Sequence, residues 1–385
     1  MKRGLLAIIA LLSCTAAAAA AESPNHWSYS NISALRRWAA MAPADALPPL
    51  PSTQLDTAVA SGDQDAIDRE ADALAFKLAK MHLLGAASST ERAGWNIVDT
   101  DKEIDLVPLL NKALAGNTLD TFYASLRPRH PDYATLRAAY ASEADPDRRA
   151  TIARNMERWR WMPQSLGPDY VLVNTALFEA SLWHGNQRTG TWKVIVGKKS
   201  TPTPVFQATI TGVILNPWWE IPASIVRESV GALARRNPSL AHARGYVWSN
   251  GRYRQKPGPN NALGQMKLVM PNRFSVYMHD TPSKQLFERD VRAFSHGCIR
   301  TGDAIGYAAT LLQGVMTLAE VDAIVASGKT TTIPLAQSLP VYITYFTAAT
   351  NADGELVIQP DIYGRDRRIR LSHGNAEEPL HGCAA

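Results

Sequence analysis

Cysteine is scarce in this chain: its 385 residues include only Cys14, Cys298 and Cys383. Small exported domains that lack a sufficient core are often held by several disulfides, which require many more cysteines. Since Cys14 lies in a leader-like segment, a single bond between Cys298 and Cys383 is the most that a mature chain could form. The scarcity therefore excludes a disulfide-based scaffold and predicts a conventional hydrophobic core.

Long apolar runs are also missing. The apolar run 5–12 is much shorter than the roughly 20 residues that span a bilayer. It follows a basic start and precedes an alanine stretch, so residues 1–21 have the three parts of a secretory signal peptide. We expect cleavage near Ala21, export to the periplasm and no transmembrane segment. The alternative is a lipoprotein signal with Cys14 as the lipidated residue, although the alanine run favours ordinary cleavage.

Metal and nucleic-acid motifs are absent as well. The chain has no CxxC and no HExxH pattern, so we predict no metal and no other cofactor. The net charge of +5 is spread over short pairs such as Arg148-Arg149 and Arg235-Arg236 instead of one continuous patch. We therefore expect no nucleic-acid partner, and a basic surface that suits an anionic wall or carboxylate-rich peptides.

The residues that carry chemistry gather in Ser295-His296-Gly297-Cys298-Ile299-Arg300. A thiol attacks as the thiolate and needs a nearby imidazole as base, for which His279 and His296 are the two candidates. Gly297 allows close approach of the backbone, whose N–H groups could bind an oxyanion. We predict that Cys298 is a nucleophile. The alternatives are a buried structural cysteine and a zinc ligand shared with the two histidines. The repeated His-Gly-Cys triplet at Cys383, in a tail without apolar periodicity, is interpreted as coincidence.

Hydrophobic periodicity divides the chain into two halves. Residues 27–160 follow a helical period, with helices expected at 65–84, 104–114, 132–140 and 147–159. From Tyr170 onward, short runs rich in β-branched and aromatic residues alternate with Gly, Pro and Asn, which is typical of strands. Strands are expected at 170–174, 178–183, 192–196, 208–215, 273–278, 340–346 and 356–359, and helices at 303–312 and 318–327. This pattern predicts an α+β protein with a helical N-terminal scaffold and a mainly antiparallel β domain.

The predicted elements also position the two central residues. Cys298 falls in a loop leading into the helix at 303–312, whose dipole and free N–H groups would favour a thiolate. His279 ends the strand 273–278. Two rigid elements can thus bring the pair into one pocket.

A family resemblance rests on these residues and on further motifs. His279, fifteen intervening residues and the hexapeptide 295–300 resemble the signature of the L,D-transpeptidase (YkuD-type) catalytic domain of bacterial cell-wall enzymes. Four more segments resemble the large, multidomain periplasmic branch of that family: Asn155–Trp161, Asn216–Pro222, Pro257–Gly264 and Val276–Pro282. The chain departs from that branch in one respect, because the connection 126–155 is too short for the usual peptidoglycan-binding domain.

The resemblance implies a domain organisation. A signal peptide (1–21) would precede a helical scaffold domain (22–160) and a catalytic domain (161–350). Within the catalytic domain, residues 223–256 would form a lid over the active site, with Gly258 and Gly264 as its hinges or turns. Residues 351–385 would add a C-terminal strand and a flexible tail.

The resemblance also assigns catalytic roles. Cys298 would attack the L-centre carbonyl of diaminopimelate in a tetrapeptide stem, release D-alanine and hold the stem as a thioester. His279 would be the base, oriented by the backbone carbonyl of Asp280. The N–H groups of Gly297 and Cys298 would form the oxyanion hole.

The substrate-binding assignments leave alternatives open. Ser295 would hydrogen-bond the turn, His296 would tune the loop or bind substrate, and Tyr277 would line the pocket. Arg300 would bind a stem carboxylate or pin the loop through an ion pair. Trp218 and Trp219 would form either core or a groove wall.

Three functional hypotheses follow, with peptidoglycan stem peptides as donor and acceptor. The first is a transpeptidase that forms 3,3 (diaminopimelate to diaminopimelate) crosslinks, or 1,3 crosslinks to L-alanine. The second is a hydrolase on the same thioester, acting as an L,D-carboxypeptidase or releasing a lipoprotein from the wall. The third is a non-catalytic wall-binding protein. The resemblance also implies inhibition by β-lactams of the carbapenem class, through Cys298.

Overall fold

A computed structural model describes residues 26–370 of the chain. The predicted signal peptide, with Cys14, and the end of the tail, with Cys383, lie outside the described residues. None of the described helices combines the length and apolar composition that crossing a membrane requires.

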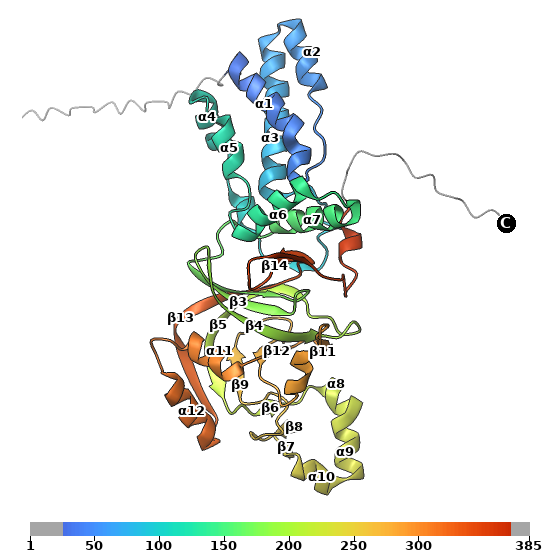
Figure 1. The fold of residues 1–385 in the computed structure, drawn as a ribbon, viewed down its shortest axis with the longest axis vertical. Helices are drawn as coiled ribbons and strands as arrows, with labels where there is room; N and C mark the ends of the chain where they lie inside the picture. The colour runs from blue at the N-terminus through green and yellow to red at the C-terminus, as the bar shows by residue number, and fades with distance from the viewer. Residues whose placement is uncertain (1–25, 371–385) are drawn as a thin grey trace, which may run out of the picture.

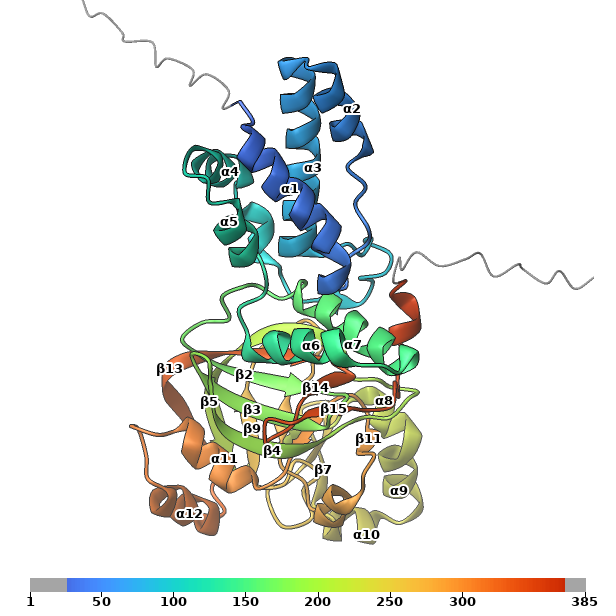
Figure 2. The same cartoon turned by 45° about the horizontal axis from the view of Figure 1, so that its top comes forward.

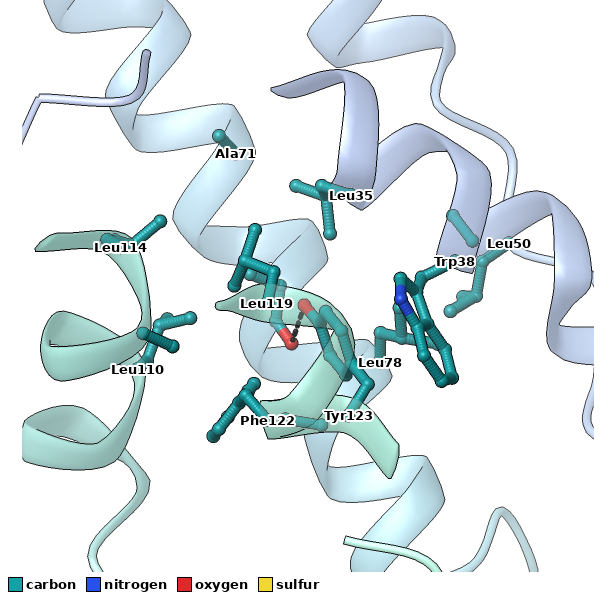
Figure 3. Close-up of a cluster of buried hydrophobic side chains, with 14 of the residues drawn as sticks. Leu35, Trp38, Leu50, Ala71, Leu78, Leu110, Leu114, Leu119, Phe122 and Tyr123 are labelled. Atoms are coloured by element: carbon teal, nitrogen blue, oxygen red, sulfur yellow. Dashed lines mark hydrogen bonds between the residues drawn. The ribbon is translucent and has the colours of Figure 1, made fainter. Parts of the chain in front are cut away.

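Five helices form an upright bundle at one end of the molecule (Figure 1). Their bounds are α1 (Tyr29–Met41), α2 (Thr53–Ser61), α3 (Gln64–Leu84), α4 (Leu106–Ala115) and α5 (Leu119–Ser125). Asp63 caps α3 by accepting hydrogen bonds from the N–H groups of residues 65 and 66. The bundle has a core of its own, in which Leu35, Trp38, Leu78 and Tyr123 meet (Figure 3). Burial of these side chains, rather than any disulfide, stabilises the bundle.

Two further helices lie between the bundle and the sheet (Figure 2). They are α6 (Pro131–Ser142) and α7 (Pro146–Trp159), and each begins with proline in its first turn. Buried Arg158 of α7 pairs with Asp366 at 2.7 Å, while Glu157 accepts a hydrogen bond from Ala87 N–H at 2.8 Å. Helix α7 thereby links the bundle, the sheet domain and the C-terminal segment.

The second half of the chain is built on a ten-stranded sheet in the order β1-β5-β13-β2-β3-β4-β12-β10-β9, with β11 attached to β4. Strand β9 also pairs with β5, so the sheet closes on itself. The strand bounds are β1 (Trp95–Asn96), β2 (Asp169–Asn174), β3 (Glu179–His184), β4 (Gln187–Gly197), β5 (Val205–Leu215), β9 (Met266–Val269), β10 (Met278–His279), β11 (Ala293–Ser295), β12 (Ile299–Thr301) and β13 (Thr331–Thr344). Most pairings are antiparallel, but β2–β13, β10–β12, β4–β11 and β1–β5 are parallel.

Further elements pack around this sheet. Helices α11 (Ala304–Leu311) and α12 (Leu318–Ser327) contribute to its core, and β14 (Ala348–Thr350) pairs with β15 (Leu356–Ile358) beneath α6 and α7. The α+β prediction is confirmed, and the helices predicted at 65–84, 104–114, 132–140, 147–159, 303–312 and 318–327 end within two residues of the observed bounds.

Residues 223–256 project from the sheet domain as a separate small unit (Figure 1). They form α8 (Ala223–Ile225), a π-helical turn η3 (Val226–Val230), α9 (Gly231–Arg236), α10 (Pro238–Ala243) and the hairpin β7 (Tyr246–Ser249) and β8 (Arg252–Gln255). Strand β6 (Trp219–Glu220) pairs with β8 and joins the unit to the sheet domain. A small core of Trp219, Ile221, Val230 and Leu263 holds it in place.

Two local predictions near the site are wrong. The strand predicted at 273–278 is reduced to β10, because Ser275 has a φ of 55° and interrupts extended backbone. Cys298 does not lead into a helix: β12 follows it directly, and α11 starts only at Ala304, capped by Asp303. The expected effect of a helix N-terminus on the thiol is therefore excluded, since a terminus acts only within its own turn.

Candidate active site

One row of side chains crosses five neighbouring strands in register. Ile214 of β5 pairs with Lys267 of β9, Lys267 with His279 of β10, His279 with Arg300 of β12, and Arg300 with Ile195 of β4. Directly paired residues point to the same face of a sheet. The row therefore places one imidazole between two basic side chains.

Cys298 and Tyr277 belong to the same face. Each precedes a member of the row by two residues on the parallel strand pair β10–β12, and side chains repeat on one face every second residue. The residues between them, Met278 and Ile299, are fully buried in the sheet core. The alternation of side chains thus places the apolar residues in the core and the reactive side chains together on the other face of the sheet.

The thiol of Cys298 contacts its neighbour strand closely. Its Sγ lies 4.0 Å from Ser275 O, and the backbone and hydroxyl of Tyr277 lie close enough to lower the pKa of the thiol. The Trp219 side chain in turn lies beside the Tyr277 hydroxyl and acts to lower its pKa. Burial raises the pKa of the thiol, and Tyr277, Lys267 and Arg300 act against that rise. The surroundings therefore supply donors and positive charge to a thiolate once it forms.

His279 is buried and uncharged. It is 5 % exposed, and burial, followed by the positive charge of Arg300, lowers its pKa to about 3. Its Nδ1 faces the carbonyl oxygen of Asp280, the Leu263 backbone also hydrogen-bonds the ring, and the ring centroid lies 5.4 Å from that of Tyr277. A neutral imidazole held in this way retains one nitrogen lone pair that can accept a proton.

The segment that follows His279 is fixed from several sides. The buried Asp280 side chain accepts a hydrogen bond from Gln265 N–H at 2.9 Å and pairs with Lys284. Its backbone N–H donates to Met266 O at 2.8 Å. Gly264 has a φ of 61°, and a Cβ there would lie 2.3 Å from Asp280 Oδ2. Besides the hinge or turn predicted at Gly264, close packing against Asp280 thus requires a glycine at this position.

The nucleophile loop is held by its own serine. Ser295 is 2 % exposed; its hydroxyl accepts from Gly297 N–H at 3.0 Å and donates to Cys298 O. Gly297 has a φ of 113°, a conformation open to glycine. The hydroxyl of Ser295 thus hydrogen-bonds the turn, as predicted, and a direct contact of Ser295 with substrate stays a prediction. The Gly297 N–H is likewise engaged, which leaves the Cys298 N–H as the backbone candidate for an oxyanion hole.

His296 contacts the small unit formed by residues 223–256. Its Nε2 lies 3.0 Å from Glu228 Oε2, and the two side chains are 41 % and 53 % exposed. This geometry favours His279 over His296 as the base of Cys298. A contact between the nucleophile loop and residues 223–256 is the role that the structure supports for His296.

Arg300, Trp218 and Trp219 occupy three different settings. Arg300 is partly buried beside Cys298, and within residues 26–370 it takes part in none of the observed ion pairs, so a loop-pinning pair is not supported. Trp219 is buried and positions Tyr277. Trp218 is half-buried under the Arg254 guanidinium, 4.6 Å from its ring centre. A direct substrate contact of either tryptophan stays a prediction.

Lys267 was missed by the sequence reasoning. It stands on the site face of β9, between buried Met266 and Leu268, with Nζ 4.1 Å from the Tyr277 ring centre. The alternation Met-Lys-Leu could have identified it as a charged residue on the outer face of a strand whose other face is buried in the core. No group of three or more His, Cys, Asp or Glu side chains in the described part of the chain is arranged to hold a metal ion, which leaves the zinc alternative without a ligand set.

Comparison with known proteins identifies two segments of the chain. A family model described as the L,D-transpeptidase catalytic domain (YkuD) matches residues 168–332, and one described as a scaffold domain matches residues 24–139. A Haemophilus influenzae protein named "Putative L,D-transpeptidase" is 31 % identical over 246 residues, which cover 58 % of this chain and 50 % of that protein. The chain thus matches about half the length of this curated relative.

The comparison with solved structures matches L,D-transpeptidases at low identity and low TM-score. An L,D-transpeptidase from Mycobacterium smegmatis is 10 % identical with a TM-score of 0.26, covering 46 % of this chain and 58 % of that one. L,D-transpeptidase 3 from Mycobacterium tuberculosis, solved with a faropenem-derived adduct, is 12 % identical with a TM-score of 0.26, covering 46 % and 60 %. Residues 168–332 of the chain are thus similar to the L,D-transpeptidase catalytic domain, and part of the chain is similar to a curated protein of that name.

Proposed function

We propose that this protein is a peptidoglycan L,D-transpeptidase that joins stem peptides through a thioester on Cys298. The observation that carries the proposal is the shared sheet face of Cys298, Tyr277 and His279, flanked by Lys267 and Arg300. A thiol next to a hydroxyl donor, a neutral imidazole and two cations is suited to acyl transfer. The match of residues 168–332 to the L,D-transpeptidase catalytic domain supports the choice of substrate.

In the first half-reaction, Cys298 Sγ attacks the scissile carbonyl of a donor tetrapeptide. A sulfur–carbon bond forms, the carbon–nitrogen bond to D-alanine breaks, and the stem is left as a thioester. His279 accepts the thiol proton, directly or through the Tyr277 hydroxyl, and passes it to the departing amine. The Cys298 N–H and the nearby cations stabilise the negative oxygen of the tetrahedral intermediate.

In the second half-reaction, an acceptor amine attacks the thioester. The new carbon–nitrogen bond forms, the sulfur–carbon bond breaks, and the amine proton returns through His279 to the thiol. We propose diaminopimelate as the acceptor, which gives a 3,3 crosslink. An L-alanine amine would give a 1,3 crosslink, and water in the same position would give carboxypeptidase or lipoprotein-releasing activity.

The proposal is tested by incubating the protein with purified tetrapeptide muropeptides and analysing the products by mass spectrometry. A dimer that has lost one D-alanine supports crosslinking, and its fragmentation separates 3,3 from 1,3 products. Tripeptide alone supports hydrolysis instead. Binding to peptidoglycan without any product would indicate a non-catalytic wall protein and overturn the proposal.

We also propose that carbapenems acylate Cys298, because a strained lactam carbonyl resembles the scissile carbonyl as an electrophile. Intact-mass analysis after exposure should show one adduct on the protein and none on Cys298→Ala. We further propose export to the periplasm. N-terminal sequencing of protein recovered from the periplasmic fraction should then begin near residue 22, whereas a lipidated N-terminal Cys14 would indicate the lipoprotein alternative.

A further inference from the structure

A hollow of about 260 Å³ is lined in part by Ser275 and Tyr277, two residues that contact Cys298. Its walls come from β5, β9 and the segment before β10, and they also include Ile214, Lys267, Val269 and Met270. Lys267 is the one charged residue in this set. The hollow is therefore mainly apolar, with a single ammonium group in its wall.

The hollow and the thiol share two residues. Ser275 O and Tyr277, which line the hollow, are also the groups that contact Cys298 Sγ. The Tyr277 ring also packs against the small core that includes Trp219, Val230 and Leu263. Tyr277 thus contacts the thiol, this small core and the hollow, so a substrate carbonyl at the thiol would lie near the hollow.

Lys267 lies there without a carboxylate partner. None of the ion pairs observed among residues 26–370 involves Lys267; its Nζ rests over the Tyr277 ring instead. Burial lowers the pKa of Lys267, while the charges of Cys298 and Glu220 act against that change. A cation that has lost part of its hydration without gaining an ion pair binds an incoming anion more strongly than an exposed lysine does.

The position of Lys267 relative to the base indicates which anion fits. Lys267 is the direct cross-strand partner of His279, the residue that returns a proton to the leaving amine. In a released D-amino acid, the carboxylate is attached to the carbon that bears this amine. A leaving amine at His279 therefore brings its carboxylate toward Lys267, and its small apolar side chain toward the hollow.

We propose that this hollow is a subsite for the leaving D-amino acid of the donor stem, and that Lys267 recognises its free carboxylate. The inference rests on the proposed transpeptidase function. It makes Lys267 a specificity-determining residue, which selects donors that end in a free acid directly after the scissile bond.

The test compares two donors, a muropeptide tetrapeptide with a free terminal acid and the same peptide with a terminal amide. The full chain, Lys267→Met and the control Lys80→Met are compared, since Lys80 is an exposed residue of helix α3 in the bundle, outside the sheet that carries the site. Acyl-enzyme formation is followed by intact mass to obtain kcat/KM. The wild type and Lys80→Met should prefer the acid by roughly tenfold to a hundredfold, as expected for one charge-assisted hydrogen bond.

In Lys267→Met the ratio of kcat/KM for the acid donor to that for the amide donor should fall close to one, mainly because KM for the acid donor rises. Alkylation by iodoacetamide, a neutral reagent, serves as a second readout. If Lys267 only tuned the thiol, Lys267→Met would slow alkylation and would lower kcat/KM by the same factor for both donors. That result would overturn the subsite. A retained acid preference would overturn it as well. If the wild type forms no acyl-enzyme with either peptide, the proposed function itself fails.

Discussion

The substitution Gly264→Ala probes how the base is held. Gly264 has a φ of 61°, and an added Cβ would lie 2.3 Å from Oδ2 and 2.6 Å from Cβ of Asp280, whose carbonyl faces His279 Nδ1. The left-handed conformation costs an alanine about 1–2 kcal/mol, and the clash adds roughly 1–3 kcal/mol, because Asp280 is buried and tied to Gln265 N–H. We expect a total loss of about 2–5 kcal/mol in the free energy of unfolding.

Gly251→Ala is the matched control. Gly251 has a similar φ of 74°, but nothing lies within 4 Å of its added Cβ. It should lose only the conformational part, about 1–2 kcal/mol. Urea denaturation measures this difference in stability. Gly264→Ala should also slow acylation, because a shift of Asp280 misplaces His279 and can slow the reaction about a hundredfold, and single-turnover acylation measures that effect. Equal stability of the two variants, with full acylation by Gly264→Ala, would refute this account of the packing.

Three further changes test other parts of the structure. Tyr277→Phe removes the hydroxyl that lowers the pKa of the Cys298 thiol, so the pH midpoint of iodoacetamide alkylation should rise by roughly half a unit to one unit; an unchanged midpoint would contradict the contact. Ser295→Ala deletes two hydrogen bonds inside the nucleophile loop and should lower the free energy of unfolding by about 1–3 kcal/mol; a higher KM at unchanged stability would instead support a substrate-binding role of Ser295. Burial lowers the pKa of His82 to about 3, so between about pH 6.5 and pH 3 the unfolded chain binds a proton that the folded protein does not, and stability falls as pH falls. His82→Phe removes the imidazole that binds this proton in the unfolded chain. Its free energy of unfolding relative to the wild type should therefore rise by about 1.4 kcal/mol per pH unit as pH drops from 6 to 4 in urea titrations; parallel curves would contradict the assignment.

Much of the fold could be predicted because its elements carry strong local signals. The helix Gln64–Leu84 has a clean 3.6-residue period, an aspartate cap and a glycine directly after its end. Strands such as β2 and β5 are long enough for β-branched runs to identify them. The two-residue strand β10 and the three-residue β12 carry no such signal, because their pairing partners lie elsewhere in the chain. Tertiary pairing, not propensity, makes them strands.

The candidate site followed the same division. Cys298 and His279 could be identified from residue type and motif, and the neighbours of His279 along the chain, Tyr277 and Asp280, came with it. Lys267 could not, because only the pairing of β9 with β10 brings it beside His279. The hydrogen bond of Ser295 to the turn could also be predicted, whereas its two backbone partners, Gly297 N–H and Cys298 O, are seen only in the structure.

Whether Cys298 forms the acyl intermediate can be decided by intact mass spectrometry of the protein mixed with tetrapeptide muropeptide and quenched in acid. We expect an adduct equal in mass to the donor minus D-alanine, located on the peptide that contains Cys298 and lost on treatment with hydroxylamine. The Cys298→Ala variant should keep the wild-type unfolding transition and carry no adduct. Crosslinked or trimmed product from Cys298→Ala, or an adduct on another residue of the wild type, would contradict the account.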